Sequence, residues 1–278
     1  MRTAYIGTTP FAAPVLDALA ASVHRPVIVI TRPPRPRGRG RRTAPTAVAQ
    51  AADRLGIQVL APERLADAAG ELAQAGPEAL CLCAYGALVR EPILGDYEIL
   101  NVHPSLLPRW RGAAPIERAI MAGDDETGVS IMRLVAELDA GPLCAREATA
   151  IGAGEDYGVL AGRLAGIAGR LLTRALDGPR AYVAQTGEAS YAEKIGSRDR
   201  VLDATKSVAE LERLVRALHP HIGARTPDGL GVEEARAAGP GAVLTFPARD
   251  GELELLRVKP PGGREMDGAA YLRGHGRN

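Results

Sequence analysis

The residues best suited to chemistry lie in the segment LNVHPSLLPRWRGAAPIERAI, residues 100–120. Asn101 and His103 are two positions apart at the end of an expected strand, so their side chains can point the same way, and Pro104 and Pro108 would stiffen the loop that follows. An amide N–H of Asn101 can bind the carbonyl oxygen of an acyl donor, and His103 can stabilise an oxyanion or carry a proton near neutral pH. The pair suits acyl transfer to an amine. Taken alone, such a pair is more often a capping Asn and a structural His.

Asp139 is the third candidate, in the segment AELDAGP. It precedes Ala-Gly-Pro after an apolar run, so a turn should expose its carboxylate. The carboxylate could orient the imidazole of His103 and stabilise its cationic form, or take the proton from an attacking ammonium through water. Asp-Ala-Gly is also a common turn, so the residue does not decide the function alone.

The sequence argues against several other kinds of chemistry. Gly7 follows a first strand, but the G-x-G-x-x-G spacing is absent and the second strand runs into Arg32 instead of an acid, which argues against a nicotinamide cofactor. The sequence has no G-x-x-x-x-G-K-[ST], no G-x-S-x-G and no His/Cys cluster with metal-ligand spacing. We therefore expect no metal. Three cysteines are too few and too scattered for a disulfide framework.

The elements around these residues indicate an α/β fold with a doubly wound, mostly parallel sheet. Short apolar runs alternate with helical patterns, and ligands of such sheets collect beyond the carboxyl ends of the strands, where Asn101 and His103 lie. A hairpin is expected from 127–134 and 143–151, and a long covering helix at 157–176. The other expected strands are 3–7, 26–31, 57–60, 79–85 and 98–102, and the other expected helices are 13–22, 47–56 and 62–76.

The chain should divide into a catalytic domain at 1–185, a linker at 186–207 and a C-terminal domain at 208–278. The linker is a polar stretch with weak periodicity, and a capped helix is expected at 207–219. The remainder is rich in Gly and Pro with short alternating runs, which suits a small β-barrel.

The charge distribution is uneven although the net charge is only +1. Six arginines and no acid lie in RPPRPRGRGRR, residues 32–42, which forms a local basic arm. No stretch approaches the roughly 20 consecutive apolar residues of a membrane helix, and the N-terminus lacks the pattern of a signal peptide. We expect a cytoplasmic protein that does not enter a membrane.

The block NVHPSLLPRWRGAAPIERAI, followed by AGDDETGVSIM and LDAG, resembles the signature of the 10-formyltetrahydrofolate-dependent formyltransferases, and nearly the whole chain is similar to the methionyl-tRNA formyltransferase family. The resemblance implies that Asn101, His103 and Asp139 are the catalytic residues. It also implies a folate donor held along the loop CAYGALV, mostly through backbone groups that read a pterin edge. The folate-binding residues implied are Ala84, Tyr85, Gly86, Ala87 and Leu88, with Ser105, Leu106, Leu107 and Pro108 from the loop that is similar to the family's substrate-side loop.

The catalytic block does not name the acceptor, because formyltransferases for glycinamide ribonucleotide or for amino sugars use related sites. The opening GTTPFAAPVLDAL, the arginine arm, YAEKI at 191–195 and an end that resembles the family's OB-like barrel favour methionyl-initiator tRNA. The resemblance thus implies formyl transfer from 10-formyltetrahydrofolate to the α-amino group of that tRNA, with no stable protein partner. The arm residues implied in tRNA binding are Arg35, Arg37, Arg39, Arg41 and Arg42.

Two alternatives stay open at this point. One is a formyltransferase that acts on an amino-sugar nucleotide or another small amine. The other is a nucleic-acid-binding protein whose folate site is vestigial. The chain also departs from the family's pattern at positions outside the catalytic set, namely Pro10, Pro34, Pro142, His221 and Arg225.

Overall fold

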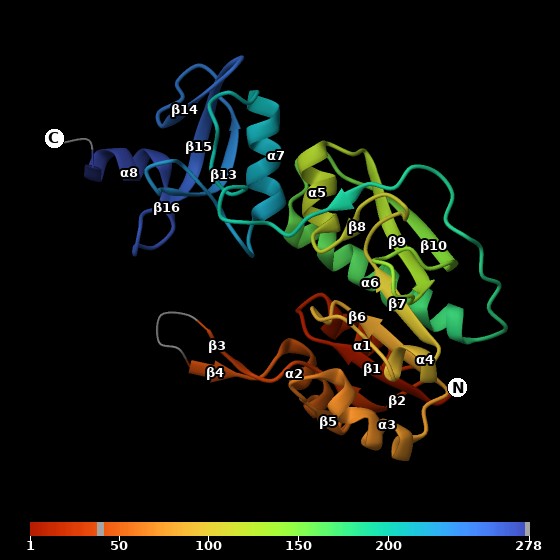
Figure 1. The fold of residues 1–278 in the computed structure, drawn as a ribbon. Coiled ribbons are helices and arrows are strands. Elements are labelled where there is room, and N and C mark those ends of the chain that lie inside the picture. Colours follow the sequence, from red (N-terminus) through yellow and green to blue (C-terminus); the bar gives the residue numbers. More distant parts are fainter. Residues whose placement is uncertain (38–41, 276–278) are drawn as a thin grey trace. The chain divides into compact units, whose positions relative to one another are not determined.

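The computed structural model describes residues 1–37 and 42–275. The chain divides into two compact units, and the ribbon in Figure 1 follows it from red to blue. Unit 1 comprises Met1–Ala113, Gly128–Thr149 and Gly162–Tyr191, and unit 2 comprises Ala114–Thr127, Ala150–Ala161 and Ala192–Asn278. None of the described helices is both long enough and apolar enough to span a membrane.

A seven-stranded sheet with the order β10-β9-β7-β6-β1-β2-β5 forms the centre of the first unit. The pairs β1–β2, β1–β6, β6–β7 and β2–β5 are parallel, whereas β7 and β9 are antiparallel. The predicted mostly parallel sheet is thereby confirmed. The strands are β1 (Thr3–Gly7), β2 (Pro26–Ile30), β5 (Val59–Leu60), β6 (Ala79–Cys83), β7 (Ile99–His103), β9 (Glu126–Arg133) and β10 (Leu143–Ala150).

Alternate residues of the inner strands pack on opposite faces of this sheet, as the two-residue period of a strand requires. Ile6 joins a core cluster with Leu72 and Ile93, whereas the hydroxyl of Tyr5 donates to the carbonyl of Ala12 at the start of α1, 2.6 Å away. Helices therefore cover both faces. The helices of this part are α1 (Ala12–Ala20), α2 (Ala47–Arg54), η1 (Leu65–Ala68), α3 (Ala69–Ala75), α4 (Ile93–Asp96) and most of α6 (Tyr157–Leu176).

Local chemistry explains where several helices begin and meet. The hydroxyl of Thr46 accepts from the N–H of Ala49 and caps α2. A Cβ atom at Gly169 would lie 2.5 Å from the Cβ of Ala18, so glycine lets α6 pack closely against α1. The single helix expected at 62–76 was wrong in detail, since the chain forms a short 3-10 helix before α3, and α3 ends at Ala75, before Gly76, which has a φ of 59°.

The basic arm is more regular at its ends than the sequence predicted. β3 (Arg35–Arg37) and β4 (Arg42–Ala44) form an antiparallel pair in which Arg35 lies opposite Ala44. Residues 38–41 lie outside the described residues. The predicted flexible arm therefore begins and ends in a short β-ladder.

The second unit is built around an antiparallel sheet with the order β12-β13-β15-β14, to which β16 is added beside β15. Within the described residues this sheet is a half-barrel, so the closed barrel predicted from the sequence is not complete. Leu211, Val215 and Leu218 of α7 pack into a core with Val232 and Leu253 of the sheet. The elements are α5 (Pro115–Ala122), α7 (Val208–Leu218), β12 (Ala224–Arg225), β13 (Gly231–Ala237), β14 (Thr245–Ala248), β15 (Gly251–Lys259), β16 (Met266–Asp267) and α8 (Gly268–His275).

His221 occupies a packed position in this unit. Its ring stacks on Tyr157 with 3.6 Å between centroids, and its Nε2 lies 2.9 Å from an oxygen of the buried Glu117. Burial, with the charge of Glu117 as a second cause, raises the pKa of Tyr157 to about 12. The imidazole of His221 is thus held by a stacking contact on one face and an acidic partner at its edge.

Candidate active site

Asn101 and His103 are the third and last residues of β7. Because they are two positions apart in a strand, their side chains lie on the same face of the sheet. Both are almost fully buried, at 6% and 4% exposure. Ser130 of β9 is opposite His103, and Leu82 of β6 is beside Asn101. The end of a buried strand, held on both sides by neighbouring strands, therefore fixes the two side chains.

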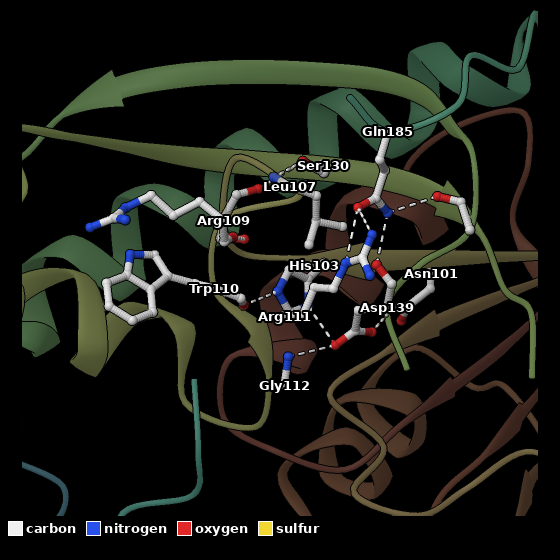
Figure 2. A network of polar contacts seen from close by, with 12 residues as sticks. Asn101, His103, Leu107, Arg109, Trp110, Arg111, Gly112, Ser130, Asp139 and Gln185 are labelled. Carbon is white, nitrogen blue, oxygen red and sulfur yellow. Dashed lines mark hydrogen bonds and ion pairs between the residues drawn. The ribbon is translucent and has the colours of Figure 1, made fainter. Parts of the chain in front are cut away.

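Asp139 lies in the turn between β9 and β10 and reaches the same point (Figure 2). Its Oδ2 accepts from the N–H of Gly112 at 2.8 Å and lies 3.7 Å from His103 Nδ1. Its Oδ1 is 3.5 Å from Asn101 Nδ2. The backbone φ of Asp139 is 47°, a left-handed conformation that is uncommon for a residue other than glycine. The structure thus brings together the three residues that the sequence singled out.

The protonation of His103 follows from its other contact. Nε2 lies 2.8 Å from the carbonyl oxygen of Trp110, and a carbonyl only accepts hydrogen bonds, so Nε2 carries a hydrogen and donates it. Nδ1, the other ring nitrogen, faces Asp139. Trp110 itself has a φ of 65°, which is unusual for a large side chain and turns its carbonyl toward the imidazole.

The loop after β7 is tied down by two serines. Ser105 Oγ donates to the carbonyl of Arg109 at 2.6 Å. Ser130 Oγ donates to the carbonyl of Ser105 at 2.7 Å and accepts from the N–H of Leu107 at 3.2 Å. Ser105 and Leu107 are buried, whereas Leu106 and Pro108 are half-buried. The loop is therefore a fixed wall beside the catalytic residues.

The loop at 84–88 leaves β6 at the same edge of the sheet, because β6 and β7 are parallel neighbours. Positive φ angles at Ala84 (44°) and Gly86 (77°) turn the chain sharply there. Thr8 Oγ1 donates to the carbonyl of Tyr85 at 3.0 Å, and burial raises the pKa of Tyr85 against the opposing charge of Arg32. Ala87 is half-buried and Leu88 is 69% exposed.

This edge offers both apolar and polar contacts to a ligand. The exposed Leu88 can pack on a flat ring, and Thr9 Oγ1 is buried with no hydrogen-bond partner among the residues that the structure describes. An unpaired buried hydroxyl is costly unless a ligand or water satisfies it. A heteroaromatic ring with a polar edge fits this combination.

The arm residues are only partly within the structure. Arg35, Arg37 and Arg42 lie in β3 and β4, whose main chain is described. Arg39 and Arg41 lie outside the described residues. The role of the five arginines in tRNA binding stays a prediction.

Sequence reasoning missed the main-chain groups of the site. The carbonyl of Trp110 and the N–H of Gly112 hold His103 and Asp139, but main-chain groups occur at every residue and carry no compositional signal. Gln185, whose side chain bonds the main chain of the Asp139 turn, was also missed because it lies outside every expected helix and strand, just before the polar linker at 186–207.

Comparison with known proteins gives one consistent family. The Formyl transferase model matches residues 1–176. Methionyl-tRNA formyltransferase of Halorhodospira halophila is 42% identical, over 98% of this chain and 96% of that protein. Phosphoribosylglycinamide formyltransferase from Bacillus halodurans is similar in structure, with a TM-score of 0.53 and 25% identity over 64% of this chain and 96% of that chain.

A third likeness concerns the fold alone. HypX from Aquifex aeolicus in complex with tetrahydrofolic acid matches with a TM-score of 0.67 and 16% identity, over 98% of this chain and 47% of that chain. This chain thus spans about half the length of HypX. The chain belongs to the formyl transferase family, among its methionyl-tRNA formyltransferases.

Proposed function

We propose that this chain transfers the formyl group of 10-formyltetrahydrofolate to the α-amino group of methionyl-initiator tRNA. The observation that carries the proposal is the convergence of Asn101, His103 and Asp139 at one edge of the sheet. It is supported by the methionyl-tRNA formyltransferase of Halorhodospira halophila, which matches this chain over nearly its whole length. An amide donor, an imidazole and a carboxylate are the groups that acyl transfer to an amine requires.

The reaction uses these groups in turn. The deprotonated amine attacks the formyl carbon, and the carbonyl electron pair moves to oxygen. Asn101 Nδ2 donates a hydrogen bond to this oxyanion, and the positive charge of protonated His103 stabilises it. Asp139 faces Nδ1 of His103 at 3.7 Å, stabilises the imidazolium and assists removal of the proton from the attacking nitrogen. When the intermediate collapses, the bond to N10 of the folate breaks, and N10 takes up a proton.

The two loops beside the catalytic residues would hold the folate. Residues 84–88 supply turned backbone that can read a pterin edge, and the exposed Leu88 supplies apolar surface. Residues 105–108 form a second loop beside the catalytic residues, fixed by Ser105 and Ser130. Both loops lie at the carboxyl edge of the sheet, where ligands of parallel sheets bind.

The tRNA would be held by regions outside the catalytic set. The arm at 35–42 provides guanidinium groups, which suit phosphates and stack on unpaired bases. The half-barrel within residues 208–278, which we assign as an OB-like tRNA-binding domain, follows the linker at 186–207 and the catalytic domain at 1–185. Such a reaction serves translation initiation, and we place the protein in the cytoplasm.

The direct test is formyl transfer by the purified protein from labelled 10-formyltetrahydrofolate. We expect transfer to methionyl-initiator tRNA, and no comparable transfer to glycinamide ribonucleotide or to an amino-sugar nucleotide. Transfer to a small amine but not to the charged tRNA would overturn the assignment of the acceptor.

The arm is tested through the salt dependence of tRNA binding. Each neutralised phosphate contributes a slope of about −0.7 to −0.9 in log K against log salt, so replacing Arg39, Arg41 and Arg42 with Ala should flatten the slope by roughly two to three units and leave folate affinity intact. A matched control replaces three exposed arginines of α6, namely Arg163, Arg170 and Arg174. Equal slopes for the arm variant and the parent would make the arm a solvated loop.

A further inference from the structure

Gln185 differs from its neighbours in the segment at 183–188. Every other residue of this segment is exposed, whereas Gln185 is half-buried. Its Nε2 donates to the carbonyl of Asp139 at 2.7 Å and to the carbonyl of Gly141 at 2.8 Å (Figure 2). Its Oε1 accepts from Nε and Nη2 of Arg111 at 3.2 and 2.8 Å. The carboxamide thus uses both donors and both acceptor positions within the catalytic edge.

The turn that Gln185 holds has an unfavourable main chain. Asp139 has a φ of 47°, which costs free energy for a residue with a Cβ atom and persists only where the surroundings enforce it. Gly141 approaches β9 so closely that a Cβ atom there would lie 1.8 Å from the carbonyl oxygen of Arg133. The turn is therefore held by Gly141 against β9 on one side and by Gln185 on the other.

Arg111 connects the main chain of this turn with its catalytic carboxylate. The guanidinium of Arg111 binds Gln185, and the next residue, Gly112, donates its N–H to Oδ2 of Asp139. Nη1 of Arg111 also lies 3.6 Å from Glu137, two residues before Asp139. Asp139 is thus held at both its carbonyl and its carboxylate by one closed network.

The segment that carries Gln185 is itself fixed on both sides. Val183 exchanges two main-chain hydrogen bonds with Leu143 at the start of β10. Ser190 accepts from the N–H of Arg111 through its carbonyl, and its hydroxyl accepts from the N–H of Trp110 at 2.9 Å. Between these points the chain has no helix or strand, so Gln185 projects from a short, anchored span.

From this geometry we infer that Gln185 is a positioning residue for formyl transfer, which acts by holding the Asp139 turn so that the carboxylate faces His103 Nδ1. This inference rests on the proposed function for its chemistry. If Gln185 has this role, the segment at 183–190, which follows α6, supports the catalytic residues. A catalytic group displaced by about 1 Å can cost about 100-fold in rate, so the loss of this support should be visible in kcat.

The test compares Gln185→Leu and Gln185→Glu with the parent and with Gln74→Leu, the same change at an exposed glutamine of α3. Gln185→Leu should lower kcat about 30- to 100-fold while KM for folate and for tRNA stays within about threefold, because binding surfaces are untouched and only the catalytic geometry is lost. Gln185→Glu keeps the acceptors for Arg111 but lacks both donors to the turn, so it should not rescue kcat. Rescue by Glu, or an equal rise of both KM values, would overturn the role.

Two further measurements separate this inference from the proposed function. Combined with Asp139→Asn, the Gln185→Leu change should cost little more in kcat, since it acts through Asp139. A crystal structure of Gln185→Leu shows the position of the Asp139 carboxylate directly, and this measurement does not depend on which amine accepts the formyl group. We expect the distance from Oδ2 of Asp139 to His103 Nδ1 to grow beyond 3.7 Å. An unmoved carboxylate overturns the inference, whereas an inactive parent protein overturns only the proposed function.

Discussion

Asp139→Asn removes the charge of the catalytic carboxylate, together with the oxygen that faces Asn101 Nδ2 at 3.5 Å. Asn has the same shape, and its Oδ1 can still accept from the N–H of Gly112. The charge lies 3.7 Å from His103 Nδ1, and both side chains are largely buried. At that distance and an effective dielectric constant of about 20, the attraction to an imidazolium is about 4 kcal/mol. A transition state that contains the imidazolium should lose up to that amount, or about 1000-fold in kcat.

The assay is the single-turnover rate of formyl transfer to charged initiator tRNA, with both substrates saturating. The matched control is Asp177→Asn, because Asp177 Oδ1 lies 2.8 Å from Nε2 of His24 in a second His–Asp pair. His24 precedes β2, so that pair lies at the opposite edge of the parallel sheet. The control should keep the parent rate. If Asp139→Asn retains a rate within about threefold of the parent, with an unchanged circular dichroism spectrum, the imidazolium does not depend on this carboxylate.

Four further outcomes are expected. Asn101→Ala should lower kcat by about 100- to 1000-fold, the usual effect of a lost oxyanion donor, and a near-parent rate would remove Asn101 from the mechanism. A stable folate analogue at about 100 times its Kd should stabilise the native protein by about 2.7 kcal/mol in thermal unfolding, whereas NAD should not, and the reverse result would contradict the folate site. Hydrogen bonds from Ser207 lower the pKa of Glu210 to about 2, so the stability they give is present above pH 4.5 and is lost as the pH falls toward 2. The thermal midpoint of Glu210→Gln should accordingly fall less steeply than that of the parent over this range, and parallel curves would show that the Glu210 carboxylate does not contribute. Gly141→Ala places a Cβ atom 1.8 Å from the carbonyl of Arg133, so both the thermal midpoint and kcat should fall, and an unchanged midpoint would show that the turn is free to move.

The sequence predicted the elements whose residues are buried in a regular pattern. β1, β2 and β6 are continuous apolar runs because both of their faces are covered, and the structure confirms them as parallel neighbours. Burial also raises the pKa of Cys81 and Cys83 in β6 to about 12, so both remain core thiols. Ser207 and Glu210 follow the Ser-x-x-Glu spacing of a capping box, and α7 begins there.

What the sequence did not predict depends on contacts between distant segments. The carbonyl of Trp110 that holds His103 is placed by a left-handed main chain, and no side-chain pattern announces such a carbonyl. Gln185 is the last residue of the predicted catalytic domain, and its role was not predicted because its partners are main-chain carbonyls 44 and 46 positions away. The half-barrel also differed from a closed barrel, since alternation within strands indicates pairing but not whether the last strand meets the first.

In the second unit, α5 is synthesised well before the residues that it contacts. α5 leaves the ribosome long before its partners: Glu117 bonds His221, 104 positions later, and Met121 packs against the core formed by α7 and the half-barrel. At a synthesis rate of about 5–20 residues per second, His221 is added about 5–20 s after Glu117. During that interval Glu117 has no His221 to bond and Met121 has no α7 to pack against, so this side of α5 stays uncovered in the nascent chain.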